Sequence, residues 1–242
     1  MIKKKKILCV IPARKGSKGF KNKNIKKIKN LTLIDWAIKC AEKSKYIDKI
    51  LLSTDYKKSQ LTKLSSKYYK KRNSELCKDS SLTFDVIREI LQEQIKSKVF
   101  FDYVVLLEPP APFRNNKLVD NCLELLHKNK GTSIVTLKKL DDYHPVRVKK
   151  FIDNLKISDF VMNEPKKGMP RQQQIDAYIR DTSVYIFKSA NFLNNKNSLY
   201  GSKKLGFVNK NKYAINIDSE LDYLLAKLVI SKKLISDKEL IQ

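Results

Sequence analysis

The sequence is short of the residues that build common metal centres and disulfide frameworks. Its four cysteines (Cys9, Cys40, Cys77 and Cys122) are far apart and show no CxxC spacing. That pattern argues against a zinc site, and against a disulfide framework in a chain of 242 residues. Only two histidines are present, so a histidine-rich metal centre is excluded. We expect the cysteines to be buried thiols that pack as small hydrophobic side chains.

Long apolar runs are also missing. No run approaches the roughly 18 residues that a helix needs to span a bilayer. The basic N-terminus leads into an apolar stretch that is too short for a signal peptide and has no cleavage site. We therefore expect a cytoplasmic protein without a membrane partner. A hydrophobic content of 42% still allows a sizeable core, in one large domain or a domain with an appendage.

Acidic residues are outnumbered two to one. Asp and Glu total 25 against 51 Lys and Arg, which gives a net charge of +26. Such an excess first suggests nucleic acid. Lysine, however, supplies 44 of the 51 basic residues and is spread over the whole length instead of forming one patch. We therefore expect no nucleic-acid partner, although a non-catalytic nucleotide-binding or RNA-binding protein remains an alternative.

Predicted strands and helices alternate along the first part of the chain. Short apolar runs predict buried strands at 5–13, 48–55, 102–113 and 131–140. Apolar residues at helical spacing predict helices at 33–44, 57–71, 84–97 and 116–128. Trp36 lies on the apolar face of the first helix and is expected in the core. This alternation predicts an α/β fold with an open, mostly parallel sheet flanked by helices.

The pattern becomes less regular from about 141 to 180, which predicts an inserted arm. A strand and a short helix are expected across 182–193, and a strand, an acidic turn and a closing helix across 212–233. We therefore predict one α/β domain built from 1–140 and 181–242, with the arm at 141–180. In open parallel sheets ligands bind beyond the carboxyl ends of the strands, where the first loop and the segment LLEPPAPFR would meet.

The loop after the first strand, within VIPARKGSKGFKNKN (10–24), carries two glycines among cations. It has neither the Walker A spacing nor the GxGxxG fingerprint. Glycines allow close approach of the backbone, and N–H groups together with cations suit a triphosphate. A solvated basic loop is the alternative that its composition alone leaves open.

This loop resembles the signature of the CMP-sialic acid synthetases (acylneuraminate cytidylyltransferases), P-A-R-x-G-S-K-G-x-x-x-K-N. Further matches follow in the same order: KRNSELCKDSSLT, LLEPPAPFR, HP at 144–145, PRQ at 170–172 and INIDSELD. They are spread over about residues 7–225, which makes chance a poor explanation. An octulosonate-type cytidylyltransferase is the nearest alternative, but its loop, P-A-R-x-x-S-x-R-L-P-G-K, fits less well. His144, which precedes a proline in the arm, is expected to be structural.

The resemblance implies a Rossmann-like nucleotide-binding domain with a dimerisation arm, and hence a homodimer. It also implies a Mg²⁺-dependent transfer that joins CTP to a nonulosonic (sialic-acid-like) sugar acid, giving the CMP-sugar and pyrophosphate. The sugar hydroxyl would attack the α-phosphate, so no protein nucleophile is needed. The lack of a Ser-His or Cys-His pair agrees with catalysis by positioning, cations and metal.

Site residues follow from the matched positions. Catalytic roles are expected for Arg14, Lys18, Lys23 and Asp218, the first three as cations that neutralise the triphosphate. Nucleotide binding is expected for Gly16, Ser17, Asn24, Arg72 and Thr83. Binding of the sugar acid is expected for Glu108, Arg171, Gln172 and Tyr185. The expected metal ligands are Asp218 and Asn216.

Four positions depart from the family pattern or keep another interpretation. Asn216 stands where the family has Asp, which removes one charge and weakens the case for two metals. Asp218 could also cap the closing helix, and Arg171 could form a surface ion pair on the arm. Glu108 replaces Gln and would repel a carboxylate unless it accepts from a hydroxyl or amino group. We therefore predict a nonulosonate other than plain N-acetylneuraminate, such as a legionaminate-like, pseudaminate-like or amino-bearing acid.

Overall fold

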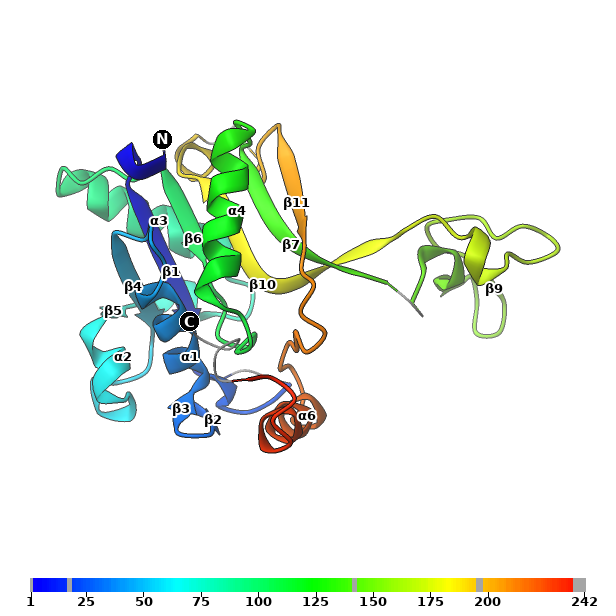
Figure 1. Ribbon diagram of the computed structural model, residues 1–242, viewed down its shortest axis with the longest axis horizontal. Coiled ribbons are helices and arrows are strands. Elements are labelled where there is room, and N and C mark those ends of the chain that lie inside the picture. The colour runs from blue at the N-terminus through cyan, green and yellow to red at the C-terminus, as the bar shows by residue number, and fades with distance from the viewer. Residues whose placement is uncertain (1, 17–18, 141–142, 195–197, 237–242) are drawn as a thin grey trace.

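A computed structural model describes residues 2–16, 19–140, 143–194 and 198–236. A seven-stranded sheet runs in the order β11-β7-β10-β6-β1-β4-β5 (Figure 1). Its strands, in chain order, are β1 (Ile7–Ala13), β4 (Lys49–Thr54), β5 (Tyr69–Lys71), β6 (Tyr103–Leu106), β7 (Ser133–Lys139), β10 (Tyr178–Lys188) and β11 (Lys204–Val208). Strand β10 pairs antiparallel with β6 and β7, and the other neighbours pair in parallel. The predicted open, mostly parallel α/β fold is confirmed.

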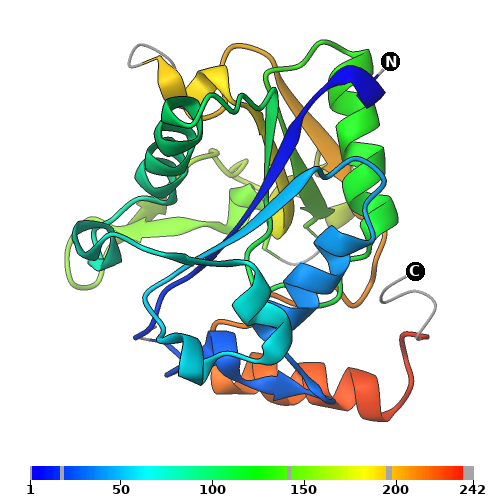
Figure 2. The same ribbon diagram turned by 90° about the vertical axis from the view of Figure 1, so that its left-hand side faces the viewer.

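Helices cover both faces of the sheet. They are α1 (Leu33–Glu42), α2 (Lys63–Lys67), α3 (Thr83–Lys96), α4 (Asn116–Lys128), α5 (Ala190–Leu193) and α6 (Glu220–Ser231). Successive side chains of a strand point to opposite faces. Accordingly, Ile7 and Cys9 of β1 pack with α1 and α4, whereas Leu8 and Val10 pack with α3 and α5. Figure 2 shows α3 on one side of the sheet and α1 and α4 on the other.

A third, smaller core cluster holds the end of the chain against its beginning. Helix α6 packs through Ala226 and Val229 on the hairpin of β2 (Lys27–Ile28) and β3 (Leu31–Thr32) and on Trp36. The Tyr223 hydroxyl donates to the carbonyl of Lys27 at 2.7 Å. Trp36 is therefore a core residue, as expected. This packing places the segment before α6 beside the first loop.

Two sequence-based expectations about elements were wrong. The helix expected over 57–71 shrinks to α2, because residues 69–71 pair with β4 as the edge strand β5. The strand expected near 215 is absent: that segment packs on the third cluster and bonds to the neighbouring loop, from Ile217 N to Pro110 O at 2.9 Å. The edge position is taken by β11, whose lysine and glycine interrupt its short apolar pattern.

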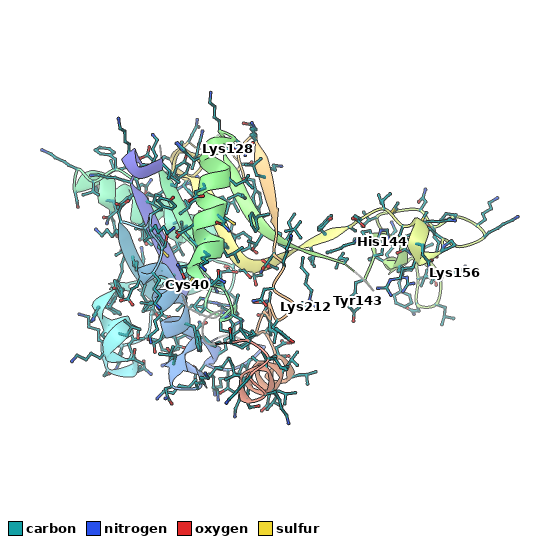
Figure 3. The ribbon with its side chains drawn as sticks, viewed as in Figure 1. Cys40, Lys128, Tyr143, His144, Lys156 and Lys212 are labelled. Carbon is teal, nitrogen blue, oxygen red and sulfur yellow. The ribbon has the colours of Figure 1, made fainter. Side chains whose placement is uncertain are left out.

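Residues 143–177 project from the sheet beyond β7 and β10 (Figure 1). They carry β8 (Lys149–Phe151) and β9 (Ile157–Asp159), which pair antiparallel. Figure 3 places Tyr143, His144 and Lys156 in this projecting segment, far from Cys40 in the sheet domain. His144 is buried and its Nε2 lies 2.8 Å from the carbonyl oxygen of Ile175, which agrees with a structural role. Strand β10 begins three residues before the predicted boundary at 181, and the division into domain and arm stays a prediction.

Three of the four cysteines are buried, as expected, and Cys77 is half-buried. Among the residues that the structure describes, no helix is long and apolar enough to cross a membrane.

Candidate active site

Hydrogen bonds to the end of β4 hold the start of the first loop. The Thr54 hydroxyl at the end of β4 donates to the carbonyl of Ala13 at 2.5 Å, and the Asp55 carboxylate accepts from the backbone N–H of Lys15 at 2.6 Å. Gly16 has a φ of +82°, in the left-handed region that favours glycine. The predicted Ser17 and Lys18 lie outside the described residues. The neighbouring strands β1 and β4 therefore fix where the loop starts.

Gly19 joins this loop to the segment before α6. A Cβ placed on Gly19 would lie 2.7 Å from the carbonyl oxygen of Asp218, closer than real Cβ contacts allow. Only a residue without a side chain lets the two backbones approach in this way. Glycine at this position therefore brings the first loop against Asp218, although the two are far apart in the sequence.

A cleft of about 620 Å³ opens at the carboxyl ends of β1 and β6. It is lined by Pro12, Arg14, Gly19, Lys23, Asn24, Arg72, Leu76, Ser81, Thr83, Val86, Glu108, Pro110, Thr182, Asn216 and Asp218. Eight of these are residues that the sequence predicted for the site: Arg14, Lys23, Asn24, Arg72, Thr83, Glu108, Asn216 and Asp218. The position agrees with the rule for open α/β sheets, and the volume is of the usual size for a small-molecule site.

One end of the cleft presents a fixed guanidinium. Arg72 is buried, and its Nη2 and Nε donate to the carbonyl and hydroxyl of Ser53 at 2.9 and 3.2 Å. Burial lowers the pKa of Arg72 from its ordinary value. The side-chain amide of Asn24, also buried, donates to the carbonyl of Arg14 at 2.9 Å. A buried, pre-positioned fork and amide suit directional recognition of a base or ribose.

Two ion pairs involve residues that line the cleft. Arg14 forms an ion pair with Asp79, which the sequence analysis did not predict. Lys23 Nζ lies 2.6 Å from Asp218 Oδ1, and the Asn216 amide donates to the other oxygen of that carboxylate. The Lys23 side chain is 15% exposed and that of Asp218 is 64% exposed, so the carboxylate is open to a ligand.

Asp218 does not cap the closing helix. Ser219 is the N-cap of α6, and it forms a capping box with Asp222. The Asp222 carboxylate also accepts from the backbone N–H of Asp218 at 3.0 Å, and these hydrogen bonds lower the pKa of Asp222 despite partial burial. The alternative role for Asp218 is therefore excluded, and its side chain is left for the cleft.

The residues at this corner fit Mg²⁺. The ion takes one or two carboxylates or neutral oxygens and completes its shell with phosphate and water. Asp218 and Asn216 provide a carboxylate and an amide within hydrogen-bond reach of each other. Across the described ranges no group of three His, Cys, Asp or Glu residues could hold a metal alone. These two residues would therefore share the ion with substrate phosphates and water.

Glu108 also lines the cleft. Burial raises the pKa of its carboxyl, while the cations Arg114 and Lys23 oppose that shift. Arg114 is fully buried beneath it and donates to the carbonyls of Ala111, at 2.7 Å, and Glu108. The loop after β6 is therefore held from below by a guanidinium. Thr182 also lines the cleft, and the sequence analysis assigned it no role.

Three predicted sugar-binding residues lie elsewhere. Arg171 and Gln172 are exposed on the 3-10 helix Arg171–Gln173 of the projecting segment. Tyr185 is buried in the middle of β10, where it pairs with Leu106 and Val135. None of the three lines the cleft of its own chain.

Comparison with known proteins assigns the chain to a family. A model described as "Cytidylyltransferase" matches residues 8–222. The chain belongs to the cytidylyltransferase family. A CMP-N,N'-diacetyllegionaminic acid synthase from Campylobacter jejuni is 32% identical over 240 residues, covering 96% of this chain and 98% of the relative. The post-translational flagellin modification protein B of Campylobacter coli is 31% identical with the same coverage.

Solved structures support the cytidylyltransferase fold. A CMP:2-keto-3-deoxy-manno-octonic acid synthetase complexed with CTP superimposes with a TM-score of 0.68, covering 94% of this chain and 99% of that one. Its sequence identity is 14%, so this likeness bears on the fold alone. The family match confirms the resemblance drawn from the motifs, and it makes the protein a nucleotidyltransferase.

Proposed function

We propose that this cytidylyltransferase joins CTP to a nonulosonic, sialic-acid-like sugar acid. The anomeric hydroxyl would attack the α-phosphorus of CTP, forming the new P–O bond as the bond to the β-phosphate oxygen breaks. The hydroxyl proton would pass to water, and pyrophosphate would leave. The observation that carries this proposal is one cleft that gathers Arg14 and Lys23 of the first loop, Arg72 and Asp218 from three separate segments.

Each group has a role that follows from its position. Arg14 and Lys23 neutralise the triphosphate and the departing pyrophosphate, since fixed cations at developing charge are the main source of catalysis in such transfers. Arg72 and Asn24 orient the nucleoside from the buried end of the cleft. Mg²⁺, when bound at Asp218 and Asn216, would screen the phosphate charge.

The sugar class is supported by two observations. One relative that matches almost its whole length to this chain is a CMP-N,N'-diacetyllegionaminic acid synthase. Glu108, in place of the family's Gln, puts an acceptor in the cleft. We therefore propose a nonulosonate other than plain N-acetylneuraminate.

The proposal is tested by pyrophosphate release. Purified protein with CTP and Mg²⁺ should turn over a legionaminate-like, pseudaminate-like or amino-bearing acid with a higher kcat/KM than plain N-acetylneuraminate. An octulosonate serves as the control for the nearest alternative. Preference for plain N-acetylneuraminate would overturn the sugar assignment, and absence of CTP binding would overturn the function. A steep salt dependence without a preference for cytosine would instead favour a binder of nucleic-acid phosphates.

We further propose a homodimer in which the projecting segment of one copy contacts the other. That segment exposes large apolar side chains, including Tyr143 at 82%, Phe151 at 73% and Leu155 at 89%. Exposed apolar clusters of this kind mark interaction surfaces. The projecting segment also carries Arg171 and Gln172, which lie outside their own cleft and would serve that of the second copy.

The proposed homodimer is tested by its mass in solution. Light scattering should give about twice the mass of 28.1 kDa for the wild type, and the monomer mass after Phe151→Lys and Leu155→Glu are combined. Leu82→Glu, at a side chain that is also well exposed but outside the projecting segment, is the matched control and should remain dimeric. A monomeric wild type would contradict the proposal.

A further inference from the structure

Thr182 is held in a backbone conformation that its side chain disfavours. Its φ is +61°, in the left-handed region. The other described non-glycine residues with positive φ are Asn22, Lys29, Lys98, Lys130 and Lys233. Asn and unbranched residues occupy this region with moderate cost, whereas a β-branched residue there is a real outlier. Strain of this kind persists when the surroundings enforce it, and it is concentrated at functional sites.

The hydrogen bonds around Thr182 hold its backbone in this conformation. The ladder between β10 and β7 shifts register between Arg180 and Tyr185, so Thr182 sits in a bulge. Directly before it, the buried Asp181 carboxylate accepts from the backbone N–H of Ser183 at 3.0 Å and from the Asn209 amide at 2.6 Å. It also accepts from the hydroxyl of Thr136 on β7. The bulge is therefore clamped from both neighbouring positions and from two other segments.

In this conformation the Thr182 hydroxyl can only accept further hydrogen bonds. Its hydroxyl donates to the carbonyl of Asp181 at 2.7 Å, which uses its one hydrogen. The remaining lone pairs can only accept. Glu108 lines the same cleft, and no hydrogen bond from the described residues reaches its carboxylate. The cleft thus offers two acceptors, the Thr182 oxygen and the Glu108 carboxylate.

Unpaired acceptors that a bound ligand covers favour donors in that ligand. A buried polar group that stays unpaired costs far more than the bond itself gains. A primary amino or amidino group brings two or more N–H donors and can satisfy both acceptors. An N-acetylamino group brings one N–H, which can satisfy only one of the two acceptors.

We propose that Thr182 is a specificity-determining residue whose strained bulge holds its oxygen, together with Glu108, to receive a nitrogen substituent with two or more N–H donors on the sugar acid. This inference rests on the proposed function and names its substrate class more closely. The ligand class is a nonulosonic acid that carries a primary amino or amidino group.

The test compares a sugar acid carrying a free amino group with its N-acetyl counterpart. The wild type should favour the amino form in kcat/KM. Thr182→Val keeps the branched shape and removes the acceptor, so this preference should fall about five- to tenfold, mainly through the KM of the sugar, with the KM of CTP unchanged. Thr182→Ser keeps the acceptor and should retain the preference.

Two glycine variants separate strain from recognition. Thr182→Gly should lose the preference and raise Tm, because glycine adopts positive φ freely. Lys98→Gly relieves a similar φ of +59° at an exposed position outside the cleft, so Tm should rise without any change in sugar preference. An unchanged preference in both Thr182→Val and Thr182→Gly, or a wild type that favours the N-acetyl form, would overturn this inference alone. A wild type that turns over no sugar acid would overturn the proposed function along with it.

Discussion

Replacing Lys23 by alanine is expected to lower kcat/KM for CTP roughly 10²- to 10³-fold, the usual cost of removing one fixed group that stabilises transition-state charge. The Lys23 ammonium is largely buried in the cleft wall and lies 2.6 Å from the carboxylate of Asp218. Lys23 is therefore already positioned where the triphosphate of CTP would meet the proposed Mg²⁺ site. Initial rates of pyrophosphate release, measured over a range of CTP concentrations, give the change directly.

The fold should survive this change. Asp218 is 64% exposed, and ion pairs with a solvated partner contribute only about 0–1 kcal/mol to stability. Lys70 provides a matched control, since its side chain is 18% exposed and its Nζ also lies 2.6 Å from a carboxylate, that of Glu93. Lys70→Ala should leave kcat/KM within about twofold and shift Tm by a similar small amount. If the two variants lost activity equally, or if Lys23→Ala kept wild-type rates, the place of Lys23 in the site would have to be abandoned.

The gathering of the cleft residues could be predicted from the sequence because two independent rules agree. The motifs identify Lys23 and Asp218, which are 195 residues apart, and the parallel-sheet rule places the loops that follow β1 and β6 at one edge. Both rules use local patterns, namely apolar runs and short spacings. Elements with strong patterns, such as α1 and α4, were found close to their real ends.

What could not be predicted depends on long-range pairing. Residues 69–71 end a sequence with the spacing of a helix, yet they form an edge strand because β4 offers an unpaired edge. Thr182 occupies the cleft only through a bulge that Asp181, Thr136 and Asn209 create together, and no window of sequence contains all three. Arg171 was assigned to the sugar site by its motif, and it lies on the projecting segment, outside the lining of the cleft of its own chain.

Replacing Asp218 by asparagine is expected to lower kcat/KM at least 10²-fold and to abolish the dependence of CTP binding on Mg²⁺. Asp218 is the carboxylate of the proposed Mg²⁺ site and its side chain contacts the amide of Asn216, so the variant leaves two neutral amides there. Mg²⁺ binds through carboxylates and phosphate, and an all-amide corner holds it poorly. Calorimetric titration of CTP with and without Mg²⁺ measures the loss independently of turnover.

Two companion variants decide between a metal ligand and a helix cap. Ser219→Ala removes the real cap of α6 and should cost about 1 kcal/mol of unfolding free energy, with kcat within a few-fold of the wild type. Asn216→Asp restores the carboxylate that the family usually has and should lower the Mg²⁺ concentration needed for half-maximal rate severalfold. Mg²⁺-dependent CTP binding that persists in Asp218→Asn would contradict the metal assignment. Equal losses of activity in Asp218→Asn and Ser219→Ala would show that the corner matters only through the start of α6.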